Sequence, residues 1–254
     1  MIQLFILADD FTGGLDTGVQ FAEKGIRTRV VTNPDVDLEQ AAQGCQVLVM
    51  VAETRHLFAR DAYEIVYRIV KKCADLGVPY LYKKTDSALR GNIGAELSAA
   101  LKASGADTLY FLPAMPGIQR TTENGIHYIG GVPVAESVFG KDPFEPVRKS
   151  SVKDLLALQS DVKAWNAVPD GIPREKGIVV VDARTEEDLQ RAGMTLKERK
   201  GLRITAGCAG FASVLPDLLG LERDETPVMP ELGNGLFVLC GSVNPITQHQ
   251  LTFA

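Results

Sequence analysis

The chain has 254 residues, 45% of them hydrophobic and 23% charged, which is enough to bury a full core in one large domain or two small ones. Its formal net charge of −5 excludes a broadly basic surface, so we expect no nucleic-acid partner. No stretch approaches ~18 apolar residues and the first residues lack the basic start of a signal peptide, so we expect no membrane span. The four cysteines are scattered without a C-x-x-C pair, which favours reduced, buried thiols and a cytoplasmic protein.

Short apolar runs alternate with segments of helical spacing through the first half of the chain. They predict strands at residues 3–8, 29–31, 47–52, 79–83 and 108–112, and helices at residues 15–24, 38–43, 60–76 and 93–103. This alternation favours an α/β fold with a mostly parallel sheet and helices on both faces.

The segment from residue 119 to residue 146 has a different texture. Two short β-like runs, 127–129 and 132–134, flank Gly130-Gly131, a turn that tolerates positive φ, and they predict a small β-hairpin insertion. The earlier pattern then returns, with a helix at 152–158, a strand at 177–181, a helix start at Thr185 and strands at 202–206 and 236–240.

Polar side chains follow three of the predicted strands at their carboxyl ends. Asp9 and Asp10 follow the first strand, Glu53-Thr54-Arg55 follows the third, and a long polar run follows the fourth. Open α/β sheets bind their ligands at this edge. We therefore expect these three segments to share one site.

The polar run at residues 83–97 carries most of the argument. It combines cations, carboxylate, hydroxyls and glycines ahead of a helix whose free N–H groups can face an anion. Lys84 and Arg90 can neutralise an acid group, Asp86 can hold hydroxyls, and Ser87 can donate or accept a hydrogen bond. A merely solvated loop fits poorly, because the glycines indicate close backbone approach. The run predicts a site for a small polyhydroxylated anion.

The two segments before it allow more than one interpretation. The carboxylates of Asp9 and Asp10 can accept hydrogen bonds from substrate hydroxyls, and one of them can act as a general base. The alternative is that Asp10 or Thr12 only caps the helix that follows. Arg55 offers a planar fork suited to a carboxylate, against the alternative that it only pairs with a surface acid such as Glu53.

No glycine-rich phosphate loop is recognisable in the chain. It lacks G-x-x-x-x-G-K-[ST], and no G-x-G-x-x-G follows the first strand, which disfavours a Rossmann dehydrogenase. The three histidines are dispersed and show no metal-ligand spacing. Gly241-Ser242, at the exit of the last predicted strand, can touch a phosphate, but only as an isolated pair.

Several segments together resemble one family, the four-carbon acid sugar kinases, long catalogued as a domain of unknown function. The resembling segments occur in family order across essentially the whole chain and comprise Ala8-Asp9-Asp10-Phe11-Thr12-Gly13, Glu53-Thr54-Arg55, residues 83–87 and 89–96, Arg120-Thr121-Thr122 with Gly125, Gly131-Val132-Pro133, Asp142-Pro143 and Gly241-Ser242. The chain departs from the family at Ala88, where Thr is frequent, and at Gln119, where Gly is frequent. The substrate subtype is therefore left open.

The resemblance implies an ATP-dependent kinase that uses Mg²⁺ and phosphorylates the terminal hydroxyl of threonate, erythronate or 3-oxo-tetronate. It implies that Asp10, Arg55 and residues 83–86 hold the acid sugar, and that Ser242 makes the first ATP contact. Asp10 is the expected catalytic residue, and no residue is assigned to a metal. With the chemistry of the residues added, the expected substrate-binding residues are Asp9, Asp10, Arg55, Lys83, Lys84, Thr85, Asp86, Ser87 and Arg90.

The resemblance also implies two domains. We expect a sugar-acid substrate-binding domain at residues 1–232 and the start of a truncated nucleotide-binding domain at residues 233–254, because the family's glycine-rich ATP-binding segment does not follow. ATP and Mg²⁺ would then be held mostly by the missing domain, and this chain alone would be inactive. The alternative is a non-catalytic sugar-acid-binding or regulatory module; a homo-oligomer stays open in both cases.

Overall fold

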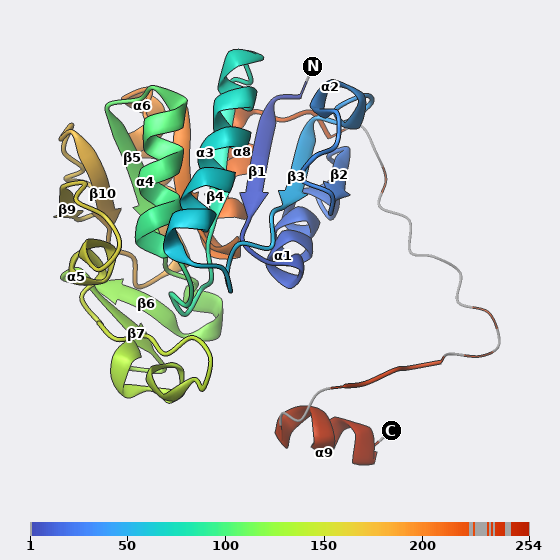
Figure 1. The fold of residues 1–254 in the computed structure, drawn as a ribbon, viewed down its shortest axis with the longest axis vertical. Helices are drawn as coiled ribbons and strands as arrows, with labels where there is room; N and C mark the ends of the chain where they lie inside the picture. The colour runs from blue at the N-terminus through green and yellow to red at the C-terminus, as the bar shows by residue number, and fades with distance from the viewer. Residues whose placement is uncertain are drawn as a thin grey trace.

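The structure of the protein is a computed structural model that describes residues 2–223, 226, 233, 235, 237–241 and 245–253. Eight of the described strands form one sheet in the order β2-β3-β1-β4-β11-β5-β10-β9, and every neighbouring pair is parallel (Figure 1). These strands span Leu4–Ala8 (β1), Thr28–Val31 (β2), Val47–Val51 (β3), Tyr80–Lys84 (β4), Thr108–Leu112 (β5), Ala164–Ala167 (β9), Gly177–Val181 (β10) and Ile204–Gly207 (β11). The predicted α/β fold class is confirmed.

Strands β1, β3 and β10 are apolar along their whole length because helices cover both faces of the sheet. Every residue of β1, β3 and β10 is buried, and their sequences are LFILA, VLVMV and GIVVV. A strand with one wet face would alternate apolar and polar residues instead. The continuous runs in the sequence therefore report burial on both sides.

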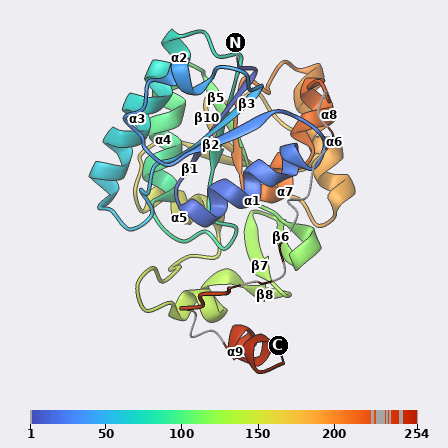
Figure 2. The ribbon, with the colours of Figure 1, turned by 90° about the vertical axis from the view of Figure 1, so that its right-hand side faces the viewer.

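Two layers of helices enclose the sheet (Figures 1 and 2). Helices α2 (Leu38–Ala41), α3 (Ala59–Asp75), α4 (Ile93–Ser104) and α5 (Val152–Ala157) contribute to the core on one face. Helices α1 (Phe11–Ala22), α6 (Glu186–Glu198), α7 (Ala209–Ala212) and α8 (Leu215–Leu219) contribute to the core on the other. The predicted helix start at Thr185 is confirmed, because its side chain and that of Asp188 form a reciprocal capping box ahead of α6.

A small antiparallel sheet lies beyond the carboxyl ends of the main strands (Figure 1). It consists of β6 (Arg120–Glu123), β7 (Ile126–Ile129) and β8 (Val132–Pro133), with the short helices η1 (Pro116–Ile118), η2 (Val134–Glu136) and η3 (Val138–Lys141) beside them in the chain. The predicted hairpin is confirmed as the β7–β8 pair, and its turn residues Gly130 and Gly131 have φ of 57° and 81°. The third strand, β6, was not predicted from the sequence.

The connections reverse direction at the neighbouring strands β1 and β4. The chain leaves β1 into α1, on one face of the sheet, and leaves β4 into α4, on the opposite face. Such a switch point opens a crevice between the carboxyl ends of the two strands, where open α/β sheets bind ligands. The polar residues that follow β1 and β4 therefore meet at this crevice.

The region after residue 223 agrees less well with the sequence analysis. The strand predicted at 236–240 is wrong for residues 237–240, which pair with no described strand, while Leu236 lies outside the described residues. Helix α9 (Pro245–Phe253) is the last element of the described chain. The domain boundary between residues 232 and 233 stays a prediction. Earlier in the chain, strand β9 was not predicted from the sequence. Among the described helices, none has the length and apolar composition needed to cross a membrane.

Candidate functional site

The candidate site lies at the crevice between β1 and β4, with the small sheet on its far side. Asp9 and Asp10 come directly after β1, Arg55 comes shortly after β3, and Lys84 ends β4. Arg120 enters from the first position of β6. Four separate segments of the chain thus bring charged groups to one edge.

Arg55 binds both aspartates that follow β1. Its Nε lies 2.7 Å from Asp9 Oδ2, and its Nη1 lies 2.7 Å from Asp10 Oδ2. Burial alone would lower the pKa of Arg55, but the charges of Asp9, Asp86 and Asp10 outweigh it and raise that pKa. Because the guanidinium is already engaged on two sides, the predicted free fork for a ligand carboxylate is not present at Arg55.

Asp9 and Asp10 differ in their access to solvent. The side chain of Asp9 is only 1% exposed, whereas that of Asp10 is 20% exposed. Asp10 also caps α1, since its Oδ1 accepts a hydrogen bond from Gly13 N at 3.0 Å. The helix-capping interpretation of Asp10 is therefore correct, and the cap leaves Asp10 facing the crevice as well.

The loop that carries Arg55 is fixed by Asn92, at the start of α4. The Asn92 amide donates to the carbonyl oxygens of Thr54, Arg55 and Leu57 at 3.0, 3.3 and 2.8 Å. Gly91, at φ 85°, lets the backbone pass close to Arg55, because a Cβ there would lie 2.9 Å from Arg55 Cγ. Asn92 was not singled out from the sequence, although it lies within the polar run.

Lys83 is directed away from the crevice. Its Nζ lies 2.8 Å from Glu96 Oε2 on α4 and donates to the carbonyl of Lys84 at 2.8 Å. Thr54 Oγ1 donates to the other oxygen of Glu96. Burial raises the pKa of Glu96, and the charge of Lys83 opposes that shift. With Lys83 only 2% exposed, this geometry does not support direct contact between Lys83 and a ligand.

Lys84 is directed to the opposite face, toward the first turn of α1. A Cβ placed on Gly13 would lie 2.4 Å from Lys84 Nζ and 2.4 Å from Asp10 Oδ1, so the glycine makes room for both groups. Lys84 is 3% exposed, and no carboxylate of the described residues lies within 4.0 Å of its ammonium. Asp10 is the neighbouring acid but forms no ion pair with Lys84, and an enclosed cation without an ion pair is costly, so this position favours an anion or a strongly polar ligand.

Asp86 and Arg90 form a two-pronged ion pair after β4. Arg90 Nε lies 2.8 Å from Asp86 Oδ2 and Arg90 Nη2 lies 3.0 Å from Asp86 Oδ1. Burial alone would raise the pKa of Asp86, but the hydrogen bonds and charge of Arg90, with the charge of Arg55, lower it to about 2. Arg90 Nη1 also lies 3.4 Å from Asp142 Oδ2, so its charge is neutralised from two sides.

Thr85 and Ser87 play different parts in the same loop. Thr85 is buried and its hydroxyl has no hydrogen-bond partner within the described part of the chain. Ser87 accepts a hydrogen bond from Arg120 Nη1 through its hydroxyl, and His127 Nε2 donates to its carbonyl at 3.0 Å. Burial lowers the pKa of His127 to about 4, which keeps the ring neutral. Ser87 is therefore held by the small sheet.

The structure thus brings together the residues predicted from the three strand exits, but it divides them into two groups. Asp9, Lys83 and Thr85 are enclosed away from Asp10, while the enclosed ammonium of Lys84 lies beside the partly exposed Asp10 at Gly13. Ser242 lies outside the described residues, so its predicted role stays a prediction. No site role was assigned from the sequence to Asn92 or Arg120, although both lie in resembling segments.

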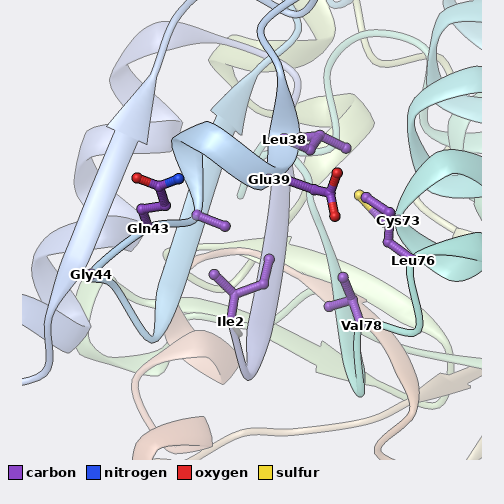
Figure 3. A pocket seen from close by; sticks show the side chains of 9 residues that line it. Ile2, Leu38, Glu39, Gln43, Gly44, Cys73, Leu76 and Val78 are labelled. Carbon is purple, nitrogen blue, oxygen red and sulfur yellow. The ribbon is translucent and has the colours of Figure 1, made fainter.

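A separate hollow lies near the amino ends of strands β1 and β4, at the opposite end of these strands from the candidate site (Figure 3). It has a volume of about 470 Å³ and is lined mainly by apolar side chains, among them Ile2, Leu38, Leu76 and Val78, with Glu39 as its charged group. No lysine or arginine lines it. This hollow is therefore unsuited to an acid ligand, and the charged crevice is the better candidate.

Comparison with known proteins identifies the family of the chain. Residues 4–215 match the family model described as the sugar-binding N-terminal domain. The D-threonate kinase of Salmonella typhimurium is 34% identical over 98% of this chain and 60% of its own length, and the D-erythronate kinase of Heliobacterium modesticaldum is 30% identical over 99% and 60%. The chain spans about 60% of the length of these curated relatives.

A solved structure has the same fold. The crystal structure of a domain of unknown function from Bordetella bronchiseptica, a domain-swapped dimer with bound citrate, superposes with a TM-score of 0.77 at 34% identity. The match covers 85% of this chain and 57% of that one.

Proposed function

The chain belongs to the family of sugar-binding N-terminal domains, and from that premise we propose that it binds the acid sugar for a kinase of four-carbon sugar acids. Its relatives are named as D-threonate and D-erythronate kinases, which supports this substrate class. The citrate in the Bordetella bronchiseptica structure adds a small hydroxy acid as a ligand of a related protein.

One observation carries the proposal: an enclosed ammonium that forms no ion pair lies beside an accessible carboxylate. Lys84 and Asp10 border the same space at Gly13. A sugar acid offers oxygens that accept from an ammonium and hydroxyls that donate to a carboxylate, so it satisfies both groups at once. A neutral apolar ligand satisfies neither.

Each accessible group has a proposed role. Asp10 accepts a hydrogen bond from the hydroxyl that receives the phosphoryl group and draws off its proton, while Arg55 keeps the carboxylate oriented at 2.7 Å. Lys84 stabilises the negative charge that develops near that hydroxyl. Asp86 and Arg90 shape the crevice wall as a closed pair. Asp9 and Lys83 support the site from behind.

The nucleotide is a separate matter. Among the described residues, no group of three or more His, Cys, Asp or Glu is arranged to hold a metal ion. We assign no Mg²⁺ or ATP ligand to the part of the chain that the structure describes. The proposal places ATP and Mg²⁺ with the remaining length of the kinase, where phosphoryl transfer needs cationic clamps and metal.

Titration calorimetry tests the proposal with this chain as it stands. D-threonate, D-erythronate and 3-oxo-tetronate are compared with threitol and erythritol, which have the same length and lack the carboxylate. We expect binding of at least one sugar acid and at least tenfold weaker binding of its polyol. Failure of all three acids to bind would reject the substrate class.

The second candidate, a non-catalytic sugar-acid-binding module, gives the same binding result. The accessible Asp10 can accept a hydrogen bond from a ligand hydroxyl in either case, and it is the names of the curated relatives as kinases that favour the kinase part. The two differ when a nucleotide domain from a related kinase is added: ATP turnover with D-threonate supports the kinase, and binding without turnover supports the module.

A further inference from the structure

Arg120 stands where the small sheet meets the carboxyl edge of the main sheet. It is the first residue of β6, and its Nη1 donates to the hydroxyl of Ser87, which follows β4. The guanidinium is half-buried. Arg120 is therefore a cation of the candidate site that comes from the small sheet.

Phe139 fixes the orientation of this guanidinium. The ring of Phe139, on η3, lies 5.1 Å from the guanidinium carbon of Arg120 and 5.2 Å from that of Arg90. Both arginines thus contact one aromatic ring, which restricts the rotation of two long side chains. A planar group held in this way loses less conformational entropy when it binds a ligand.

The two arginines on this ring differ in their counter-ions. Arg90 binds Asp86 at 2.8 Å and Asp142 at 3.4 Å, whereas no carboxylate of the described residues lies within 4.0 Å of Arg120. Burial also lowers the pKa of Arg120, and the charge of Asp86 opposes that shift only in part. The free cation on the ring is therefore Arg120.

Comparison with the other cations of the site indicates which ligand group Arg120 can bind. Arg55 and Arg90 already hold carboxylates of the protein, and Lys84 is a point charge beside Asp10. A guanidinium binds a carboxylate through two parallel N–H donors, a geometry that lysine lacks. We propose that Arg120 binds the carboxylate of the sugar acid and makes the small sheet the wall that selects acids over neutral sugars.

This inference rests on the proposed function and adds the orientation of the bound sugar acid. With the carboxylate at Arg120, the hydroxyl end of the ligand lies toward Lys84 and Asp10. The small sheet then acts in specificity, and the β1 and β4 exits act on the reacting end.

The test measures acid selectivity rather than affinity alone. Calorimetry compares D-threonate with D-threonamide, which has the same carbon skeleton and no negative charge, for the wild type, Arg120→Met and Arg120→Lys. Arg184→Met is the matched control, because Arg184 is exposed and pairs with Glu123 at 3.3 Å, at the other end of β6. The melting temperature of each variant is measured without ligand.

We expect Arg120→Met to bind D-threonate about 10- to 100-fold more weakly and D-threonamide as the wild type does. Arg120→Lys should lose part of that preference, and Arg184→Met none. Equal weakening of both ligands would mean a structural role only, and an unchanged preference would mean no role; either result overturns the inference. If the Met variant does not fold, the preference of Arg120→Lys decides, since an unchanged value overturns the inference. A wild type that binds no sugar acid rejects the proposed function itself.

Discussion

Lys83 and Lys84 are neighbours on one strand, yet they occupy two different chemical environments. The ammonium of Lys83 lies on the α4 face, 2.8 Å from Glu96, with both side chains 1% exposed. The ammonium of Lys84 lies on the α1 face, beside Gly13, and no described carboxylate pairs with it. Successive side chains of a strand point to opposite faces, so a shift of one residue separates the two.

The difference shows how a buried charge can serve structure or binding. A buried cation that has a paired acid and further hydrogen bonds is neutralised by the protein itself and needs no ligand. A buried cation without one is stable only if the fold compensates its desolvation elsewhere, and a ligand can supply the missing charge. We therefore propose that the α4 face supports the site and that the α1 face binds the ligand.

The largest effect is expected from breaking the complete pair. Glu96→Leu leaves Lys83 charged and enclosed, so the free energy of unfolding should fall by about 3–5 kcal/mol. Urea denaturation measures it. The double variant Lys83→Met with Glu96→Leu removes both charges and should recover most of the loss. A single variant as stable as the wild type would contradict the structural role of the pair.

The free energy of unfolding should depend on pH through His127, whose ring contacts the carbonyl of Ser87 in the candidate site. Its pKa is about 4 in the folded protein against 6.5 in the unfolded chain. The unfolded chain thus binds more protons between these values, so stability is present above pH 6.5 and is lost as the pH falls toward 4, by about 3 kcal/mol.

The measurement is the free energy of unfolding at several pH values, with His127→Gln as the comparison. The difference between the two proteins isolates this titration from those of the carboxylates. The prediction fails if the variant and the wild type lose the same stability between pH 6.5 and pH 4.

Lys84→Met should act on binding and not on stability. Removing an unpaired, enclosed charge should leave the free energy of unfolding unchanged or slightly higher. D-threonate affinity should fall by about 1.5–3 kcal/mol, since a charge-assisted contact is lost. Calorimetry and urea denaturation of the same preparation separate the two effects, and a destabilised variant with normal affinity would reverse the assignment of the two lysines.

A smaller effect is expected at Gly13, where the new Cβ of Gly13→Ala would lie 2.4 Å from Lys84 Nζ and from Asp10 Oδ1. Alanine favours the helix by about 1 kcal/mol, which should offset the cost of moving the two side chains, so the free energy of unfolding should change little. Because Lys84 and Asp10 are displaced, D-threonate should bind about tenfold more weakly. Gly18→Ala is the matched control in the same helix. The atom nearest to its new Cβ would be Cγ2 of Val30, at 3.2 Å and away from the site. Equal affinities of the two variants would count against a ligand near Gly13.

The sequence predicted the fold class and the elements with strong periodicity. Buried runs such as β3 and helices such as α3 carry their own signal. Strand β9 was missed because its sequence, AWNA, is short and two of its residues are exposed. The strand predicted at 236–240 is apolar, but apolar composition alone does not supply a neighbouring strand with which to pair.

The candidate site was predicted as a set of segments, not as a set of roles. Strand exits on one edge could be inferred from the order of elements, and so could the convergence of Asp10 and Lys84. Which lysine faces α4 depends on the start of the strand to within one residue, and the sequence does not define that boundary. The counter-ions of Arg55, and the contact of Arg120 with Ser87, depend on contacts between distant segments, whereas the Arg90–Asp86 pair is local.

The position of D-threonate in a crystal structure of this chain tests the central claim most directly. The account predicts ligand oxygens within hydrogen-bond distance, about 3.2 Å, of Lys84 Nζ and of the Asp10 carboxylate. It is contradicted by D-threonate bound in the hollow near Ile2 and Leu38, or bound elsewhere while Lys84 pairs with an acid of the protein itself.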